Sequence, residues 1–333
     1  MKNLILNQNY GKLYEDVYKG KCEVFEFQNS LGSVKHLFIK REVPNPLEGV
    51  IYYDLITPFT YGGPVIEGCK EEDKWDLIND FRNEFMMYCQ ENNIVSEFIR
   101  FHPLLFNSMD FLHCYELDYV EDSRGIDISR HSNPVAEGFS VGAIAKVLEA
   151  FKSGLDYEIF TEKERIGDFS RFLTKVQNSK ENKSPQYIEF CKDLLEDQLI
   201  FVEVKFDGEV VGMSVNILTD KVLTTHLFVT DRTGDSLDAA FVLHYGLTVW
   251  CRNNGIELIH LAGNWIQKNT EENASFRNNF GVLSDYKYCI GRKIWNEEVY
   301  EELCDKARIK RYVDYFPAYR VDERGQGFSP FID

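Results

Sequence analysis

The sequence predicts an α+β (mixed α/β) protein of two domains. Strand-like runs rich in β-branched and aromatic residues alternate with amphipathic helical segments along the chain. The order hairpin, strand, loop, helix, strand occurs once in each half, as two divergent copies of one unit would show, although unrelated mixed proteins also show such alternation. A length of 333 residues suits two domains, and 25 Phe with 18 Tyr can fill a core in each.

The first half is expected to contain strands around one long helix. Strand-like runs cover residues 24–27, 34–40 and 50–56, with turn residues between them. Residues 73–92 predict an amphipathic helix whose apolar stripe consists of Trp75, Ile78, Phe81, Phe85 and Tyr88. Further strands are expected at 94–101 and near 112–120.

The stretch 121–134 is polar and rich in turn residues, so we place the domain boundary there, with domains 1–134 and 135–333. In the second domain, Asp207-Gly208 between two strand-like runs predicts a tight hairpin. The other helices expected there cover 135–153, a capping-box segment from Thr161, a segment opened by Ser184-Pro185, 237–253 and 271–279. The other strands expected there are 157–160, 222–229, 256–261 and 285–291.

The charge of the chain restricts its partners. It has 37 Lys+Arg and 54 Asp+Glu, a formal net charge of -17 at pH 7. Such a chain repels the phosphates of nucleic acids and of an anionic membrane surface. We therefore expect no membrane partner and regard nucleic acid as an unfavourable one, while a local basic pocket for a small anion remains compatible with the composition.

Signals for targeting and for metal binding are missing from the sequence. No run of about 18 apolar residues predicts a membrane-spanning helix, and residues 1–10 lack the features of a signal peptide. The eight cysteines form no C-x-x-C pair, and the histidines do not show the spacing of a zinc site. We expect a cytoplasmic protein with reduced thiols and no metal.

A loop with the composition of a phosphate site follows the strand that ends at Val229-Thr230. Residues 231–236 contain a glycine and lead into a helix, and backbone N–H groups at a helix start can bind phosphate or pyrophosphate. The next strand ends at residues 260–264. Parallel strands that diverge at their carboxyl ends open a cleft for a ligand, so we expect this strand end to lie beside the loop.

The order of elements in the second half resembles the GNAT acyltransferase fold. Segments spread over about 20–330 also resemble the Fem-type, BioF2-like branch, in which two GNAT-like domains follow each other. The segments that carry this resemblance are 53–64 (Y-D-L-I-T-P-F-T-Y-G-G-P), 99–105 (I-R-F-H-P-L-L), 260–264 (H-L-A-G-N), Phe276-Arg277-x-x-Phe280-Gly281 and 290–293 (I-G-R-K). The resemblance implies two tandem GNAT-like domains, each a mixed, mostly antiparallel twisted sheet flanked by helices.

The resemblance also implies an activity: transfer of an acyl group, expected to be acetyl, from acyl-CoA to an amine. The acceptor would be an amino sugar, an amino acid or a cell-envelope precursor, and the donor is expected in the second domain. Two departures keep alternatives open: residues 232–236 match the GNAT pyrophosphate motif poorly and include Asp235, and Arg277 stands near the position of the usual GNAT tyrosine. The alternatives are an aminoacyl-tRNA-dependent transferase of the peptidoglycan type and a catalytically silent GNAT-like binding protein.

Candidate site residues follow from residue type and position. His226 and His260 suit a general base because imidazole titrates near neutrality, while Asn264 and Arg277 suit donor binding or oxyanion stabilisation. Tyr286 is the candidate general acid. Donor contacts are expected from Phe228, Val229, Thr230, Thr233, Gly234 and Ser236, and acceptor contacts from Tyr61, Gly62, Gly63, Arg100 and His102. For each residue a purely structural role, such as a core histidine or a glycine turn, is the alternative.

Overall fold

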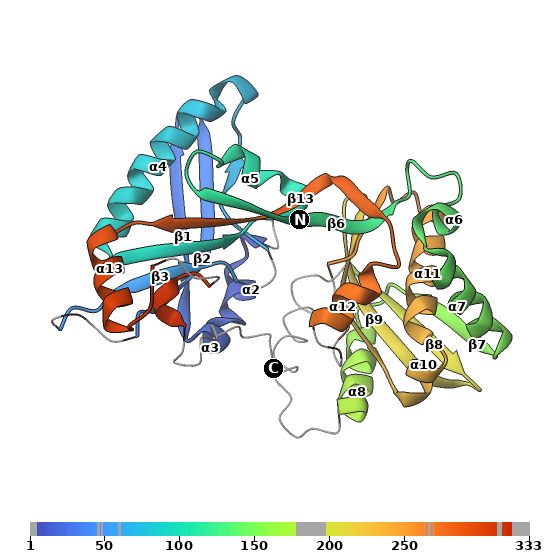
Figure 1. Ribbon diagram of the computed structural model, residues 1–333. Coiled ribbons are helices and arrows are strands. Elements are labelled where there is room, and N and C mark those ends of the chain that lie inside the picture. The colour runs from blue at the N-terminus through green and yellow to red at the C-terminus, as the bar shows by residue number, and fades with distance from the viewer. Residues whose placement is uncertain are drawn as a thin grey trace. The chain divides into compact units, whose positions relative to one another are not determined.

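The computed structural model forms two compact units (Figure 1). Unit 1 contains Met1–Glu121 and Tyr286–Asp333, and unit 2 contains Asp122–Asp285. The structure describes residues 5–44, 47, 49–58, 61–177, 198–262, 264–265, 268, 270–311 and 315–321. The helix expected from Ser184-Pro185 therefore lies outside the described residues.

The boundary between the units differs from the predicted division after residue 134. Strand β6 (Glu116–Asp127) leads the chain into unit 2, where it pairs antiparallel with β11 (Leu258–His260). Strand β13 (Val282–Ile294) leads the chain back to unit 1, where it pairs antiparallel with β5 (Ile94–Arg100). Unit 2 is therefore an insertion in unit 1. Pairing between segments so distant in the sequence leaves no mark in local composition, which is why the polar stretch after residue 121 gave a different boundary.

The sheet of unit 1 has the strand order β1-β2-β3-β5-β13, with β4 on β2. Strands β3 and β5 are parallel, and the other neighbours are antiparallel. The strands not yet bounded are β1 (Gly20–Asn29), β2 (Gly32–Glu42), β3 (Tyr53–Ile56) and β4 (Val65–Glu67). The helices are α2 (Gln8–Lys12), α3 (Glu15–Tyr18), α4 (Lys74–Glu91), α5 (Asn107–Asp110) and α13 (Glu297–Lys306), with 3-10 turns η1 (Glu71–Asp73), η2 (Pro103–Leu105) and η3 (Ala318–Arg320). The long helix expected at 73–92 is thus confirmed.

Helix α4 buries a row of side chains spaced four residues apart. Leu77, Phe81 and Phe85 are at most 1% exposed and belong to the core cluster of unit 1. Trp75, which the sequence placed in the apolar stripe, is 55% exposed, and its ring meets that of His113 edge-on. Residues two positions apart on a helix point in nearly opposite directions, so a buried face that contains Leu77 turns Trp75 outward.

The sheet of unit 2 has the order β6-β11-β10-β9-β8-β7, with β12 on β10. Strand β10 runs parallel to β11 and β12 and antiparallel to β9. The strands not yet bounded are β7 (Leu155–Phe160), β8 (Leu199–Phe206), β9 (Glu209–Thr219), β10 (Val222–Thr230) and β12 (Asn264–Trp265). The β8–β9 hairpin turns at Asp207 and Gly208, whose φ angles of 50 and 81 fit the turn that Asp-Gly predicts. The hairpin prediction is confirmed.

Two helices form the core of unit 2 with its sheet. Helices α7 and α11 lie in unit 2 with the strands of its sheet (Figure 1). Both helices bury apolar side chains in one cluster with Ile200, Val202 and Val204 of β8. The helix expected over 135–153 is divided into α6 and α7, because Ser140 accepts the N–H of Ala143 and starts a new helix there. The helices of this unit are α6 (Pro134–Gly138), α7 (Val141–Lys152), α8 (Arg165–Gln177), α10 (Arg232–Ser236), α11 (Ala239–Asn253) and α12 (Thr270–Arg277).

The cysteines of the described chain are unpaired thiols, and most of them are buried. Burial raises the pKa of Cys251 to about 12 and that of Cys114 to about 11. Such thiols stay protonated at neutral pH and are poor nucleophiles, so they are core residues. None of the helices within the described ranges is long and apolar enough to cross a membrane.

The packing of α4 predicts two different mutational costs on one helix. Phe85→Ala removes a fully buried ring and should lower the free energy of unfolding by about 3–5 kcal/mol. Trp75→Ala removes an exposed ring and should change it by less than about 1 kcal/mol. Urea unfolding of both variants beside the wild type measures the difference. Equal costs for the two changes would contradict the assigned buried face.

Candidate functional site

Strand β10 is irregular on both of its edges at the same place. On one edge it pairs with β11 as far as Thr224 and with β12 again from Leu227. On the other edge its register against β9 shifts across His226, which therefore occupies a β-bulge. Bulges re-aim side chains and interrupted parallel pairs open a sheet edge, so both features recur beside ligand sites. His226 is thus the centre of the candidate site in unit 2.

Two histidines with lowered pKa values lie at this irregularity. His260 ends β11 opposite Thr224 and is only 1% exposed, whereas His226 stays partly accessible. Burial lowers the pKa of both histidines to about 4, and the positive charge of Arg277 adds to the shift at His260. Both rings are therefore neutral at pH 7. A neutral imidazole can accept a hydrogen bond from an amine, but a pKa near 4 makes it a weak base.

The bulge also changes which way the side chains of β10 face. Leu223 and Phe228 lie in the same buried cluster although five residues separate them. In a regular strand an odd separation puts two side chains on opposite faces. The alternation of side chains is therefore reversed between Leu223 and Phe228, on either side of the bulge. Phe228 and Val229 are core residues, so a donor molecule could reach only their backbone.

The loop after β10 uses its polar groups internally. The side chain of Asp231 accepts the N–H of Gly234 at 2.8 Å, and the hydroxyl of Thr230 donates to the carboxylate of Asp235. The hydroxyl of Ser236 donates to the carbonyl oxygen of Thr233 at 2.8 Å. The structure thus brings together Thr230, Thr233, Gly234 and Ser236, the predicted phosphate contacts. A carboxylate already fills the position that an anion would take at this helix start.

The remaining predicted catalytic residues belong to different parts of the chain. Arg277 ends α12 and acts on His260 through its charge. The backbone of Asn264 pairs with Leu227, while its side chain lies outside the described residues. Tyr286 belongs to unit 1, where its ring packs 5.4 Å from that of Phe106. The structure therefore does not group Tyr286 with His226 in one unit.

The predicted acceptor residues of unit 1 do come together, at the carboxyl ends of β3 and β5. The N–H of Gly62 donates to the carbonyl oxygen of Arg100 at 2.8 Å. The ring of Tyr61 lies 5.3 Å from the rings of both His102 and Tyr288. Burial raises the pKa of Tyr288, while the nearby charge of Arg100 acts in the opposite direction. The cluster combines a guanidinium with aromatic rings, a chemistry that can hold a carboxylate.

The glycines and His102 of this cluster also have clear structural roles. Gly63 has a φ of +87, and a Cβ there would lie 3.0 Å from the ring of Phe101. Nδ1 of His102 accepts the N–H of Leu104 at 3.2 Å, which fixes the ring orientation at the start of η2. The glycine requirement is therefore a matter of backbone conformation as well as of ligand access.

Asn107 is a residue of this cluster that the sequence did not reveal. Its amide nitrogen donates to the carbonyl oxygens of Gly62 and Pro64 at 2.8 and 3.1 Å. Its amide oxygen accepts the N–H of His102 at 3.1 Å. A single buried side chain thus ties the Tyr61–Pro64 loop to the end of β5. No sequence pattern marks an asparagine that bonds to backbone groups some 45 residues away.

Part of the chain matches the profile of a known protein family. Residues 144–273, all within unit 2, match the family profile described as Acetyltransferase (GNAT) domain. This segment contains β10, its bulge and both histidines of the candidate site. A search of curated proteins gives no significant match.

Solved structures match most of the chain, at identities that establish the fold alone. FemX matches with a TM-score of 0.58 and 9% identity, over 88% of this chain and 92% of that chain. A conserved protein of unknown function from Bacteroides thetaiotaomicron VPI-5482 matches with a TM-score of 0.52 and 12% identity, over 88% of this chain and 92% of that chain. The C-terminal domain of a putative lysylphosphatidylglycerol synthetase from Agrobacterium fabrum matches with a TM-score of 0.51 and 12% identity, over 91% of both chains. The chain thus has the Fem-like tandem GNAT fold that the resemblance implied.

The lowered histidine pKa values predict how stability depends on pH. His244, whose ring donates to the carbonyl oxygen of Ala240 at 2.8 Å, also has its pKa lowered to about 4 by burial. The unfolded chain then binds more protons between pH 6.5 and 4, so stability falls as the pH drops through this window. Each such histidine contributes up to about 1.4 kcal/mol per pH unit to this loss in the free energy of unfolding.

His244→Phe should therefore lose less stability on acidification than the wild type. From pH 7 to pH 5 the difference between the two proteins should be about 2 kcal/mol, because one histidine no longer titrates. Urea unfolding of both proteins at the two pH values measures it. Parallel losses would show that His244 is not held neutral by burial.

Proposed function

We propose, from the match of residues 144–273 to the acetyltransferase (GNAT) domain family, that the chain transfers an acyl group from acyl-CoA to the nitrogen of a small amine. The observation that carries the proposal is the interruption of β10, which lies inside the family segment. Acetyl is the expected acyl group. The acceptor classes are an amino sugar, an amino acid and a cell-envelope precursor.

Acyl transfer to an amine needs three things from the site. The amine attacks the thioester carbonyl only in its deprotonated form, so a group at the site must accept its proton directly or through water. The tetrahedral intermediate carries a negative oxygen that hydrogen-bond donors must stabilise. The C–S bond then breaks, and the thiolate of CoA takes up a proton. We assign both proton transfers to water, because His226 keeps partial exposure although its Nε2 is buried.

We assign the histidines and Arg277 complementary roles in these steps. Neutral His226 accepts a hydrogen bond from the attacking amine and orients its lone pair toward the carbonyl carbon. A pKa near 4 suits this orienting role better than full proton removal, so water bound at His226 is the assigned proton acceptor. Arg277 places a positive charge beside His260, where it stabilises the oxyanion or the departing thiolate.

The donor is expected to bind through its acyl and pantetheine portions rather than through its pyrophosphate. Asp231 occupies the N–H group at the start of α10, and Asp235 adds a second carboxylate to the same turn. Two carboxylates repel a pyrophosphate. Nζ of Lys268 lies 3.7 Å from Oδ2 of Asp235 and offsets the charge of that carboxylate. We therefore expect donor affinity in the micromolar range or weaker, with the adenosine end loosely held.

The same acidic turn favours a second candidate, in which the donor is an aminoacyl-tRNA and the acceptor is a peptidoglycan-type precursor. A donor without a CoA pyrophosphate has no need of a phosphate loop at α10. The net charge of -17 acts against this candidate, because it repels the tRNA backbone. The binding-only alternative requires that neither donor binds.

Calorimetric titration with acetyl-CoA tests the proposal. The wild type should bind with micromolar affinity, and Arg277→Ala should bind about tenfold or more weakly, because a hydrogen bond or contact to a charged group contributes about 1.5–3 kcal/mol. Arg252→Ala is the matched control, since Arg252 is exposed on α11 of the same unit. This control should bind as the wild type does.

The other outcomes separate the alternatives. No heat from a folded sample would exclude acyl-CoA as the donor, and a gel-shift titration with aminoacyl-tRNA would then test the second candidate. Failure of both donors would leave the binding-only alternative. Weakening by Arg252→Ala equal to that by Arg277→Ala would remove Arg277 from the site.

A further inference from the structure

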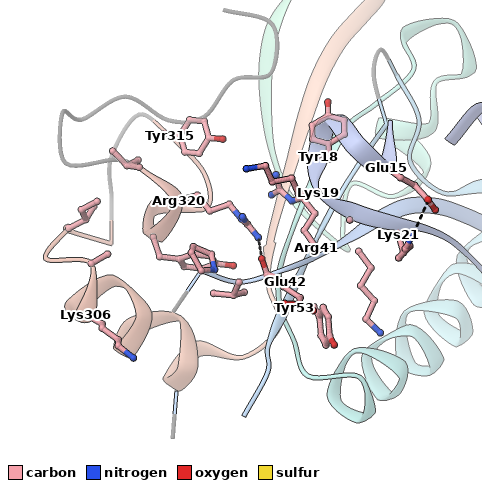
Figure 2. Close-up of a pocket in the computed structure, with 18 of the residues that line it drawn as sticks. Glu15, Tyr18, Lys19, Lys21, Arg41, Glu42, Tyr53, Lys306, Tyr315 and Arg320 are labelled. Atoms are coloured by element: carbon pink, nitrogen blue, oxygen red, sulfur yellow. Dashed lines mark hydrogen bonds and ion pairs between the residues drawn. The ribbon is translucent and has the colours of Figure 1, made fainter. Parts of the chain in front are cut away.

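A broad groove opens in unit 1, away from both clusters considered so far. Its volume is ≈ 2150 Å³, and it is lined by α3, the start of β1, the end of β2 and residues 306–310, 315 and 319–321 (Figure 2). Strand β3 runs from Tyr53 to Ile56, and the groove includes Tyr53, whereas the Tyr61–Arg100 cluster follows Ile56. The groove therefore lies at the opposite end of β3 from that cluster, and all of its lining belongs to one unit.

The charge of the groove is opposite to that of the chain. Eight of its lining residues are basic and four are acidic, while the whole chain has a formal net charge of -17. The basic residues are Lys19, Lys21, Lys40, Arg41, Lys306, Arg308, Lys310 and Arg320. Like charges gathered in a concave surface repel one another and focus a positive potential. A multivalent anion relieves this repulsion, and a single carboxylate relieves less of it.

Two arginines at the base of the groove share one buried carboxylate. Nε of Arg41 donates to Oδ1 of Asp54 at 2.7 Å, and Nε of Arg320 donates to Oδ2. The hydroxyl of Tyr319 also donates to Oδ2, at 3.2 Å. Asp54 is 0% exposed and Arg41 is 3% exposed, so one negative charge is buried against two positive charges. Buried charge without a full counter-charge is unfavourable, and a bound anion would supply the missing charge.

Arg41 has a side-chain nitrogen that can donate a further hydrogen bond. Its Nη2 is buried, and no acceptor for it is found among the residues that the structure describes. Arg320 instead uses Nη2 on the carbonyl oxygen of Glu42, at 2.6 Å. Figure 2 shows the nitrogen ends of Lys19, Arg41 and Arg320 turned toward one another. A planar guanidinium with a spare N–H beside further cations is the arrangement that binds phosphate oxygens.

The backbone at Lys19 supports a ligand-binding role for its side chain. Lys19 ends α3 in the left-handed region, with φ 53 and ψ 49, a position that glycine usually occupies. A lysine there is less favourable than a glycine, because its Cβ is crowded. The residue gains instead a side chain that reaches the groove from the helix end.

From these observations we infer that the groove is a binding site for a phosphorylated small molecule, whose phosphoryl group lies against Lys19, Arg41 and Arg320. Nη2 of Arg41 and the ammonium of Lys19 bind the phosphate oxygens, and Arg320 adds charge from its ion pair with Asp54. The lysines and arginine at 306–310 attract the anion from solvent. This inference concerns unit 1 alone and is independent of the proposed acyl transfer in unit 2.

Calorimetric titration of the full chain with sodium pyrophosphate and with inorganic phosphate tests the inference. The wild type should bind at least one of the two anions, with an affinity that falls as KCl is added. Lys19→Gln should weaken binding at least fivefold, because Lys19 is exposed and its loss leaves the fold intact. Lys70→Gln is the control, since it removes an equal charge from an exposed site outside the groove, and it should bind as the wild type does.

Arg41→Lys adds a readout of geometry. It retains the charge but removes the guanidinium fork, so it should also weaken binding, and circular dichroism reports whether the variant is folded. Tighter binding of pyrophosphate than of phosphate supports a diphosphate ligand, and equal binding supports a single phosphoryl group. No binding of either anion by the wild type would overturn the inference, and so would equal affinity in Lys19→Gln, Lys70→Gln and the wild type.

Discussion

The antiparallel pairing of β13 with β5 is the contact on which the organisation of unit 1 depends. It runs from Ile290 opposite Arg100 to Ile294 opposite Ser96. This pairing returns the chain to the sheet of unit 1. The segments that follow β13, namely α13 and the segment with Tyr319 and Arg320, can then pack near Asp54 of β3. Ser96 then meets the hydroxyl of Tyr319 at 2.8 Å, and the arginines close around Asp54. The basic groove exists only because this strand pair brings the two ends of unit 1 together.

Unit 2 depends on a different constraint, the break in β10. A regular strand would pair along its whole length with its parallel neighbours and would offer a ligand no contact with its backbone edge. The bulge at His226 and the change of partner from β11 to β12 fall at the same residues. In the proposed chemistry the break gives a ligand access to the strand backbone, beside histidines that burial keeps neutral and the charge of Arg277. Because Asp231 already occupies the N–H of Gly234 at the start of α10, the proposed acyl-CoA donor is expected to be held mainly by its acyl end.

Local chemistry made much of the fold predictable from the sequence. Asp207-Gly208 specified the hairpin because both residues must adopt positive φ, and the spacing of Phe81 and Phe85 specified α4. The domain division at 134 differed from the structure because the pairing of β13 is non-local. The bulge at His226 was not predicted, because a bulge leaves no trace in hydrophobic alternation.

The sites were predictable only in part, for the same physical reason. Residue type made Arg100 and His102 candidates, and the structure places them near each other. The asparagine that holds their loop bonds to distant backbone groups, and no sequence pattern indicates such contacts. The net charge of -17 excluded extended basic surfaces and left room for a local one. The groove around Arg41 is such a surface. Its cations are spread from Lys19 to Arg320 in the sequence, so only the fold assembles them.

Hydrogen exchange with and without saturating acetyl-CoA tests the central claim, that the reaction centre is the interrupted strand β10. The account predicts added protection of backbone amides in residues 224–228 and 256–262, with little change over 232–236, where Asp231 already holds the amide of Gly234. Protection confined to unit 1, or an unchanged exchange pattern across β10 under conditions where the donor is bound, would contradict it.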